Sequence, residues 1–226
     1  DVCSSDLEAK ESTQYAHYTA DKVITGMYDA LNHMGFNGGR IIEAGAGVGN
    51  FMGLMPEHMR GNSRFTAVER ERIAGGIAKA LYPNQNVQLQ DFRSFNAPDG
   101  YFDAAIGNPP FSSTTLTDLS GRKHLSGLSI HNYFFAKNVD LLRDGGVMAM
   151  VVSNSFMDAK GDKARRYIGE RTKLLGAIRL PNNAFSKNAN TEVTTDIVFL
   201  QKLPESEWAG RAAKEDAKRW MGLSYV

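Results

Sequence analysis

The stretch RIIEAGAGVGNF, residues 40–51, joins a short apolar run to a loop with three glycines and to the start of a helix-like segment. An apolar run that passes through glycines into a helical pattern is typical of a βα unit. Strand-like and helix-like segments alternate on both sides of this unit along most of the 226 residues. The alternation predicts an α/β fold with a doubly wound, mostly parallel sheet of seven strands.

Outward from the loop, apolar spacing predicts a helix that follows Thr19 as its N-cap and stops at Gly35. Further helices are predicted over residues 50–59, 71–82, 129–146 and 163–175, with a polar helix over 205–222. Strands are predicted over residues 64–70, 86–91, 101–108, 147–152, 176–181 and 192–202.

The composition sets limits on the class of protein. With 42% hydrophobic and 23% charged residues, the chain suits one globular domain, and its apolar runs are too short to span a bilayer. The single cysteine excludes an internal disulfide and fits a reducing cytoplasm. The five histidines lack metal-ligand spacing, so no metal site is expected. A net charge of +1 is low for a dedicated DNA-binding domain.

The glycine loop is the first candidate ligand site, because doubly wound sheets bind ligands beyond the carboxyl ends of their strands. Gly45, Gly47 and Gly49 allow a tight turn, but their spacing differs from the G-x-G-x-x-G of dinucleotide binders. Glu43, two residues before the first glycine, favours a cofactor that carries an amino group. A plain strand-to-helix turn is the alternative.

Acidic residues also end the next two predicted strands. Glu69 stands 20 residues after Gly49, where a carboxylate can accept hydrogen bonds from ribose hydroxyls. Asp91 and Phe92 follow the third strand, where a carboxylate can accept from an adenine amine and a ring can stack on the base. The alternatives are a solvated charge at Glu69, a turn aspartate at Asp91 and a core ring at Phe92.

The fourth strand ends in Asn108-Pro109-Pro110-Phe111. Prolines restrict the preceding residue to extended geometry, so this segment is a stiff corner. The Asn108 amide and the Pro109 carbonyl offer two neighbouring acceptors, and Phe111 offers a flat apolar face. This combination suits a planar substrate with an NH2 group, whose nitrogen lone pair becomes available as the nitrogen pyramidalises. The following residues 112–129 are either a surface loop or a mobile lid over the substrate.

EAGAGVGNF, VE, QDF and NPPF, in this order, resemble the motifs of class I S-adenosylmethionine-dependent methyltransferases with the Rossmann-like fold. The motif order is similar to that of the γ-type N6-adenine DNA methyltransferases. Residues 129–153 and 180–202 resemble a narrower group, the methylase domains of phage, plasmid and conjugative elements, often fused to a helicase. The resemblance covers residues 15–203, and the ring of NPPF and the segment 192–202 favour nucleic acid as substrate.

The resemblance implies roles in binding S-adenosyl-L-methionine. Tyr18 and Thr19 are expected near the methionine part, although Ala20 replaces the proline that usually follows in this motif. Glu43 and the loop Ala44, Gly45, Gly47 and Gly49 are expected to hold the amino-acid moiety, Glu69 the ribose, and Asp91 and Phe92 the adenine.

The resemblance also implies roles toward the substrate. Asn108 and Pro109 of the Asn108-Pro109-Pro110-Phe111 corner would hold the target N6 amine, and Phe111 would stack on an adenine flipped from duplex DNA. Phe185 matches the aromatic residue that covers the base from the other side. The expected reaction is direct displacement at the sulfonium methyl group.

These patterns predict three parts: a disordered or fragmentary start over residues 1–14, a catalytic domain over 15–203, and a helix or linker over 204–226. A recognition or helicase domain, fused or separate, is expected as partner, and the isolated domain is expected to methylate weakly. Three alternatives remain open: an N5-glutamine protein methyltransferase, an RNA adenine methyltransferase, and a non-catalytic module that binds cofactor or DNA.

Overall fold

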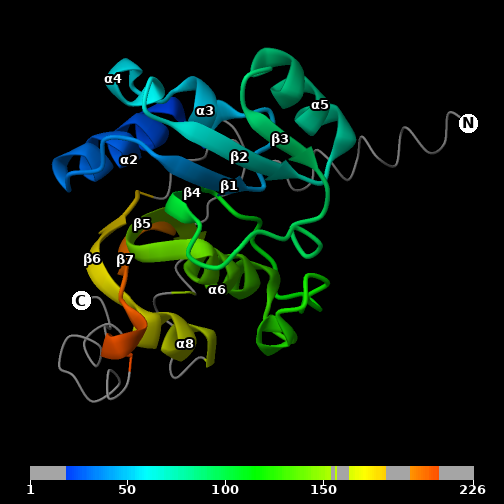
Figure 1. The fold of residues 1–226 in the computed structure, drawn as a ribbon, viewed down its shortest axis with the longest axis vertical. Coiled ribbons are helices and arrows are strands. Elements are labelled where there is room, and N and C mark those ends of the chain that lie inside the picture. Colours follow the sequence, from blue (N-terminus) through cyan, green and yellow to red (C-terminus); the bar gives the residue numbers. More distant parts are fainter. Residues whose placement is uncertain (1–18, 154–155, 157–162, 182–193, 209–226) are drawn as a thin grey trace, which may run out of the picture.

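The protein is described by a computed structural model that covers residues 19–153, 156, 163–181 and 194–208. A seven-stranded sheet with the order β3-β2-β1-β4-β5-β7-β6 forms its centre (Figure 1). The strands are β1 (Arg40–Ala44), β2 (Arg64–Glu69), β3 (Asn86–Leu89), β4 (Phe102–Gly107), β5 (Leu142–Ser153), β6 (Thr172–Arg179) and β7 (Thr195–Lys202).

The prediction of a mostly parallel sheet is confirmed from β3 to β5, where every neighbouring pair is parallel. The last strand differs, since β7 lies between β5 and β6 and runs antiparallel to both. β6 and β7 are consecutive in the chain and adjacent in the sheet, and such neighbours pair antiparallel when no crossover separates them. All side chains of β7 except that of Gln201 are buried.

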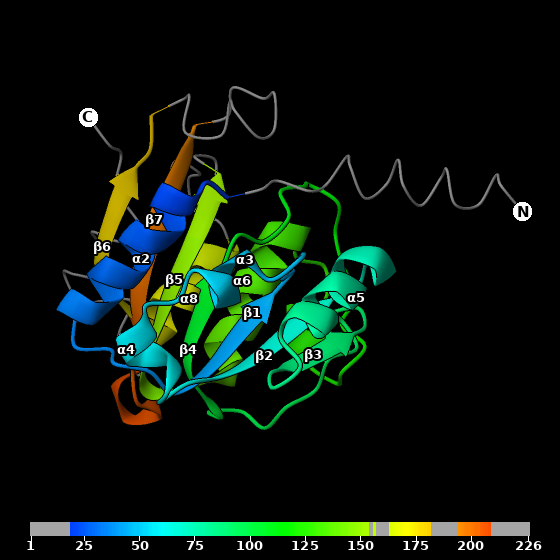
Figure 2. The same cartoon turned by 90° about the horizontal axis from the view of Figure 1, so that it is seen from above.

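The described helices are α2 (Asp21–His33), α3 (Asn50–Gly53), α4 (Glu57–Arg60), α5 (Arg72–Leu81), α6 (Ile130–Leu141) and α8 (Lys163–Arg171). α2 and α5 cover one face of the sheet, and α6 and α8 cover the other (Figure 2). Alternate residues of each strand divide between the two faces, as the pleat requires. On β1, for example, Ile42 packs in the cluster of α6 and α8, and Ile41 packs in the cluster of α2.

Several sequence predictions need correction. Residues 50–59 form two short helices instead of one, because Pro56 lies between them as the N-cap of α4. The N-cap of α2 is Ala20, not Thr19, and no side chain caps this helix. α6 ends at Leu141, before the predicted Gly145 and Gly146, because β5 begins at once.

Other predictions fall wholly or largely outside the described residues. They concern Tyr18, Phe185, the segment 1–14 and the polar helix of the C-terminal part, of which only the turn Glu205–Glu207 is described.

The order of the strands brings the candidate motifs together. β1 lies beside β2 on one side and β4 on the other, so the strand order reverses between β1 and β4. The glycine loop follows β1 and Asn108 follows β4, so both lie at the same edge of a parallel pair. Ligands of doubly wound sheets bind at this reversal.

Candidate functional site

The glycine loop is held against the end of β2 by hydrogen bonds that its backbone N–H groups donate. The N–H of Gly45 donates to the carbonyl of Val68 (2.8 Å), and the N–H of Gly47 donates to Oε2 of Glu69 (2.8 Å). Gly49 has φ +88°, and a Cβ there would lie 2.6 Å from Met52 and 2.7 Å from Tyr82. The tight turn therefore requires glycine at this position.

Glu43 is the most unusual residue of the site. Its side chain is 2% exposed, and its Oε2 has no hydrogen-bond partner among the described residues. Burial and, to a smaller extent, the nearby charge of Glu69 raise the pKa of Glu43 well above its ordinary value. Because buried polar atoms are almost always hydrogen-bonded, the free oxygen points to a ligand that donates to it.

Glu69 and Asp91 lie where the sequence places them, at the end of β2 and shortly after β3, and both have protein partners. Glu69 accepts through Oε2 from Gly47 and through Oε1 from the N–H of Glu71 (2.7 Å). Each carboxylate oxygen has two lone pairs, so room for ribose hydroxyls remains.

Asp91 forms a salt bridge with Arg93, with 2.8 Å between Oδ2 and Nη2. Its partial burial favours a higher pKa, but the hydrogen bonds from Arg93 outweigh that effect and lower the pKa of Asp91.

Phe92 is a core residue, which was the alternative that the sequence left open. The ring is 2% exposed and lies 4.8 Å from Phe134 and 6.0 Å from Phe95, measured between ring centroids. These contacts leave little of the Phe92 ring for a cofactor, and its stacking on adenine remains a prediction.

The Asn108–Phe111 corner lies against the glycine loop. A Cβ at Gly45 would lie 3.7 Å from Cδ of Pro110, and a Cβ at Gly107 would lie 3.7 Å from Cγ of Glu43. Glu43, the glycine loop and the corner therefore form one continuous site.

The side chains of the corner are fixed by contacts outside it. Nδ2 of Asn108 donates to Oγ1 of Thr19 (3.1 Å). Phe111 is partly exposed, and its ring packs edge-on against His131 at 5.5 Å.

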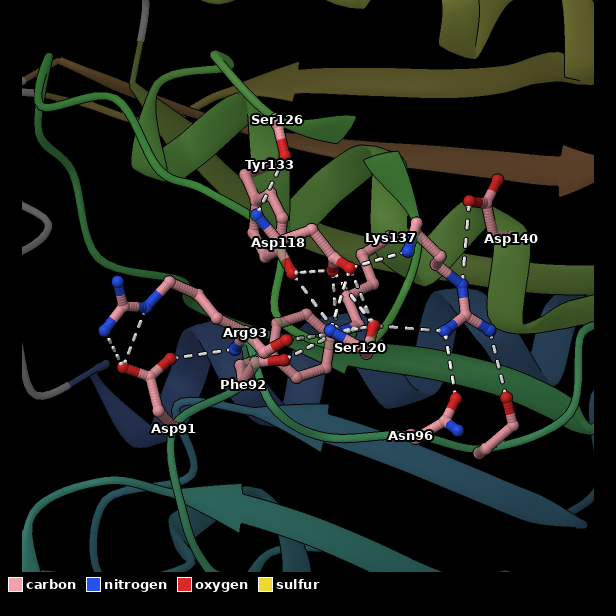
Figure 3. Close-up of polar contacts among 12 residues, drawn as sticks. Asp91, Phe92, Arg93, Asn96, Asp118, Ser120, Ser126, Tyr133, Lys137 and Asp140 are labelled. Atoms are coloured by element: carbon pink, nitrogen blue, oxygen red, sulfur yellow. Dashed lines mark hydrogen bonds and ion pairs between the residues drawn. The ribbon is translucent and has the colours of Figure 1, made fainter. Parts of the chain in front are cut away.

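Three features of the site could not be predicted from the sequence, and they concern Thr19, Phe134 and Lys137. Thr19 was predicted near the cofactor, but its direct contact is with the amide of Asn108. Phe134 lies 3.9 Å from where a Cβ of Gly45 would be, so its ring borders the glycine loop. Lys137 is fully buried beside the turn of Asp91 (Figure 3), and its one signal was a lysine within the apolar helix pattern NYFFAKNV.

The described residues contain neither a metal-binding cluster nor a membrane-spanning helix. Over the described ranges, no three histidine, cysteine or acidic side chains lie close enough to hold a metal ion. No helix in the same ranges is long and apolar enough to cross a membrane.

Comparison with known protein families identifies the chain. The family model of the Eco57I restriction-modification methylase matches residues 56–185, more than half of the sequence. The chain belongs to this family. The matched range contains Glu69, Asp91 and Asn108–Phe111, whereas Glu43 and the glycine loop precede it.

Individual relatives agree with this assignment. Defense against restriction protein B of Escherichia phage P1 is 27% identical over 191 residues, which are 83% of this chain and 8% of that protein. The type II restriction enzyme and methyltransferase RM.Eco57I of Escherichia coli is 27% identical over 150 residues, 60% of this chain and 15% of that protein. The chain therefore spans a small part of these relatives, and the first of them confirms the resemblance to a phage protein.

The fold is also found in solved structures. The type I restriction-modification methyltransferase subunit of Streptococcus thermophilus superimposes with a TM-score of 0.68 at 21% identity. The match covers 83% of this chain and 45% of that subunit. At this identity the likeness concerns the fold alone.

Proposed function

We propose that this chain transfers a methyl group from S-adenosyl-L-methionine to the N6 amine of adenine in DNA. The observation that carries the proposal is the position of the Asn108–Phe111 corner. It follows β4 at the reversal of strand order and lies against the glycine loop that follows β1. A donor of methyl groups bound by that loop would face an amine held by the corner.

The residues present fit the cofactor. Glu43 offers the amino group of the methionine moiety a buried oxygen that has no partner within the described ranges. A cationic amino group also favours the ionised carboxylate, which the protein alone disfavours. Glu69 would hold the ribose, and Asp91 would accept from the adenine amine. When bound, S-adenosyl-L-methionine supplies an electrophilic methyl group on a sulfonium.

The chain's own residues would position the amine and would not act as a strong base. The carbonyl oxygens of Asn108 and Pro109 accept hydrogen bonds from the two N–H groups of N6, which aims the nitrogen lone pair at the methyl group. The edge-on contact with His131 holds the ring of Phe111, which stacks on the base. Catalysis then rests on orientation and on acceptors fixed in advance.

DNA would be engaged with its target adenine flipped out of the duplex, since N6 is not accessible for attack inside the stack. With a net charge of +1, the chain gains little nonspecific attraction to phosphates. We therefore assign recognition of a DNA sequence to a partner domain or subunit. We also propose that the protein acts in the cytoplasm.

The proposal is tested with the purified chain and its Asn108→Ala variant. Both are incubated with labelled S-adenosyl-L-methionine and, separately, with duplex DNA, RNA and a protein extract, and products are identified by mass spectrometry. We expect N6-methyldeoxyadenosine from the unmodified chain and at least a hundredfold less from Asn108→Ala. Asn84→Ala changes an exposed turn residue before β3, away from the site, and is expected to retain activity.

The other outcomes separate the alternatives. Label on protein glutamine or on RNA adenine would show that the substrate is not DNA, while the proposed mechanism of methyl transfer would still hold. Binding of S-adenosyl-L-methionine without transfer to any of the three would contradict the proposed activity of this chain.

A further inference from the structure

Residues 112–129 connect Phe111 to α6. The contacts that fix this segment include the hydrogen bond from the N–H of Leu119 to the carbonyl of Arg93 (3.0 Å), and two further sets centre on Asp118 and Arg122. In the first set, the carboxylate of Asp118 accepts from the hydroxyl of Tyr133 (2.5 Å) and from the N–H groups of Arg122 (2.7 Å) and Ser120 (2.9 Å). In the second set, the guanidinium of Arg122 donates to the carbonyl of Ala97 (3.0 Å) and pairs with Asp99. The segment is therefore docked on α6 and on the residues that follow β3.

Lys137 of α6 lies at the centre of this arrangement (Figure 3). Its Nζ donates to the carbonyl of Phe92 (2.7 Å), to Oγ of Ser120 (3.0 Å) and to the hydroxyl of Tyr133 (3.2 Å). It also lies 3.4 Å from Oδ1 of Asp118, and both side chains of this pair are 0% exposed. Burial lowers the pKa of Lys137 to about 8, although the charge of Asp118 opposes that change.

The contacts of Lys137 join three parts of the chain that are distant in sequence. The carbonyls of Phe92 and Arg93, at 2.7 and 3.3 Å, belong to the turn that carries Asp91. The ammonium also lies 4.9 Å from the centroid of the Phe92 ring, within the range of a cation–π contact. Lys137 thus fixes both the backbone and the ring of the residue next to Asp91.

We propose that Lys137 is a positioning residue for the cofactor's adenine: its ammonium holds the Asp91–Arg93 turn in place and ties it to the segment that follows the Asn108–Phe111 corner. The inference rests on the proposed function, because it gives a role to a group next to the proposed adenine site. Asp118 is the counter-ion that allows the ammonium to be buried. Without the ammonium, the carbonyls of Phe92 and Arg93 lose their common donor. The turn then keeps only its own hydrogen bonds and the bond from the N–H of Leu119 to the carbonyl of Arg93 (3.0 Å), so Asp91 is held less firmly.

The test separates positioning from simple charge compensation. Lys137→Met removes the ammonium and keeps an unbranched apolar chain, but it leaves the Asp118 carboxylate buried without its cation. The double variant Lys137→Met/Asp118→Asn removes both charges. We expect the Kd for S-adenosyl-L-methionine, measured by calorimetry, to rise about tenfold in both variants. The free energy of unfolding should recover in part in the double variant, because no buried charge then lacks its partner, while the Kd stays raised.

Kinetics give a second measurement. The KM for S-adenosyl-L-methionine should rise in step with the Kd, while kcat at saturating cofactor changes less than threefold, because Lys137 touches no atom of the reaction. Lys202→Met is the matched control, since Lys202 is also buried and donates to a carbonyl of α6, that of Val139 (2.6 Å). It should lower stability and leave the Kd unchanged.

A double variant that regains the original Kd would show that Lys137 only neutralises Asp118, and would overturn the inference. An unchanged Kd in both variants would do the same and would leave the proposed function intact. If the unmodified chain does not bind S-adenosyl-L-methionine, the proposed function fails, and the inference fails with it.

Discussion

Two buried ionisable side chains, Glu43 of β1 and Lys137 of α6, have very different hydrogen-bond surroundings. Glu43 ends with an oxygen that has no partner among the described residues. Lys137 donates to oxygens of the Asp91–Arg93 turn, of residues 112–129 and of its own helix. A buried polar group without a hydrogen-bond partner indicates a ligand-binding role. A buried group whose donors are all used indicates a structural role, in which it holds separate segments of the chain together.

The pKa values of the two regions reflect this difference. Burial raises the pKa of Glu43 well above its ordinary value of 4.5. Burial would also raise the pKa of Asp118, the partner of Lys137, but hydrogen bonds from Tyr133, the Arg122 N–H and Ser120 lower it to about 2. The two carboxyl groups must therefore affect stability in opposite directions as the pH changes.

Breaking the Lys137 region should have the largest effect on stability. Asp118→Asn leaves the ammonium buried without a counter-ion and turns an amide NH2 toward donors that need an acceptor. We expect the free energy of unfolding at pH 7 to fall by about 3 kcal/mol, measured by urea denaturation. A loss below about 1 kcal/mol would show that the pair is not a structural unit.

The pH dependence of the free energy of unfolding at acid pH gives a second test of Asp118. Because the folded pKa of Asp118 is about 2 and its ordinary value is 3.8, its contribution is complete above pH 3.8. It is lost as the pH falls toward about 2, so Asp118→Asn should flatten that part of the stability curve. An unaltered acid slope in the variant would contradict the assignment.

A substitution at Glu43 should have the opposite pattern of effects. It should weaken cofactor binding by a smaller free energy and should not lower stability. Glu43→Gln keeps the shape and removes a buried charge, so the free energy of unfolding should not fall. The Kd for S-adenosyl-L-methionine should rise about tenfold, equivalent to about 1.4 kcal/mol, through loss of a charge-assisted hydrogen bond. Calorimetry at fixed pH measures this, and a destabilised variant with unchanged Kd would reverse the comparison.

The pH dependence sharpens the prediction for Glu43. Its raised pKa means that the folded state loses stability as the pH rises from 4.5 through the folded value, where the buried carboxyl must ionise. Cofactor binding favours the ionised form, so affinity in the unmodified chain should increase across that range. In Glu43→Gln both slopes should disappear.

The smallest effect is expected at Asp103, which serves as a reference because its carboxylate is 18% exposed and its partners lie at the surface. Asp103 pairs with Arg40 and Arg143, whose side chains are 43% and 47% exposed. Asp103→Asn should cost less than about 1 kcal/mol and should depend on salt. A cost equal to that of Asp118→Asn would show that burial does not distinguish the two acids.

The sequence predicted the elements well where local chemistry decides them. Residues 40–51 gave a strand, a glycine turn and a helix start because apolar runs and glycines act locally. The prediction of a single helix over residues 50–59 was wrong. The apolar pattern continues across Pro56, but the proline separates two short helices. The antiparallel direction of β7 had no local signal, since it depends on where the chain returns to the sheet.

The candidate site divides in the same way. The types and order of Glu43, Glu69, Asp91 and Asn108 could be read as a ligand site because each ends a strand. The burial of Lys137 could not be predicted, since its partners Phe92 and Asp118 lie 45 and 19 residues away in the chain. The contact between Asn108 and Thr19 joins residues 89 positions apart in the chain, so it could not be predicted either.

By itself, the sequence determined the alternation of strands and helices, the glycine turn, the rigid Asn108–Phe111 corner and membership of a methylase family. These follow from short-range sterics and from residue types in a fixed order. Only the tertiary structure decided that Oε2 of Glu43 has no partner in the described part of the chain, that Phe92 belongs to the core and that Lys137 bonds to both the Asp91–Arg93 turn and Ser120. Desolvation and hydrogen bonding depend on which distant residues surround a group, and only folding brings those residues together.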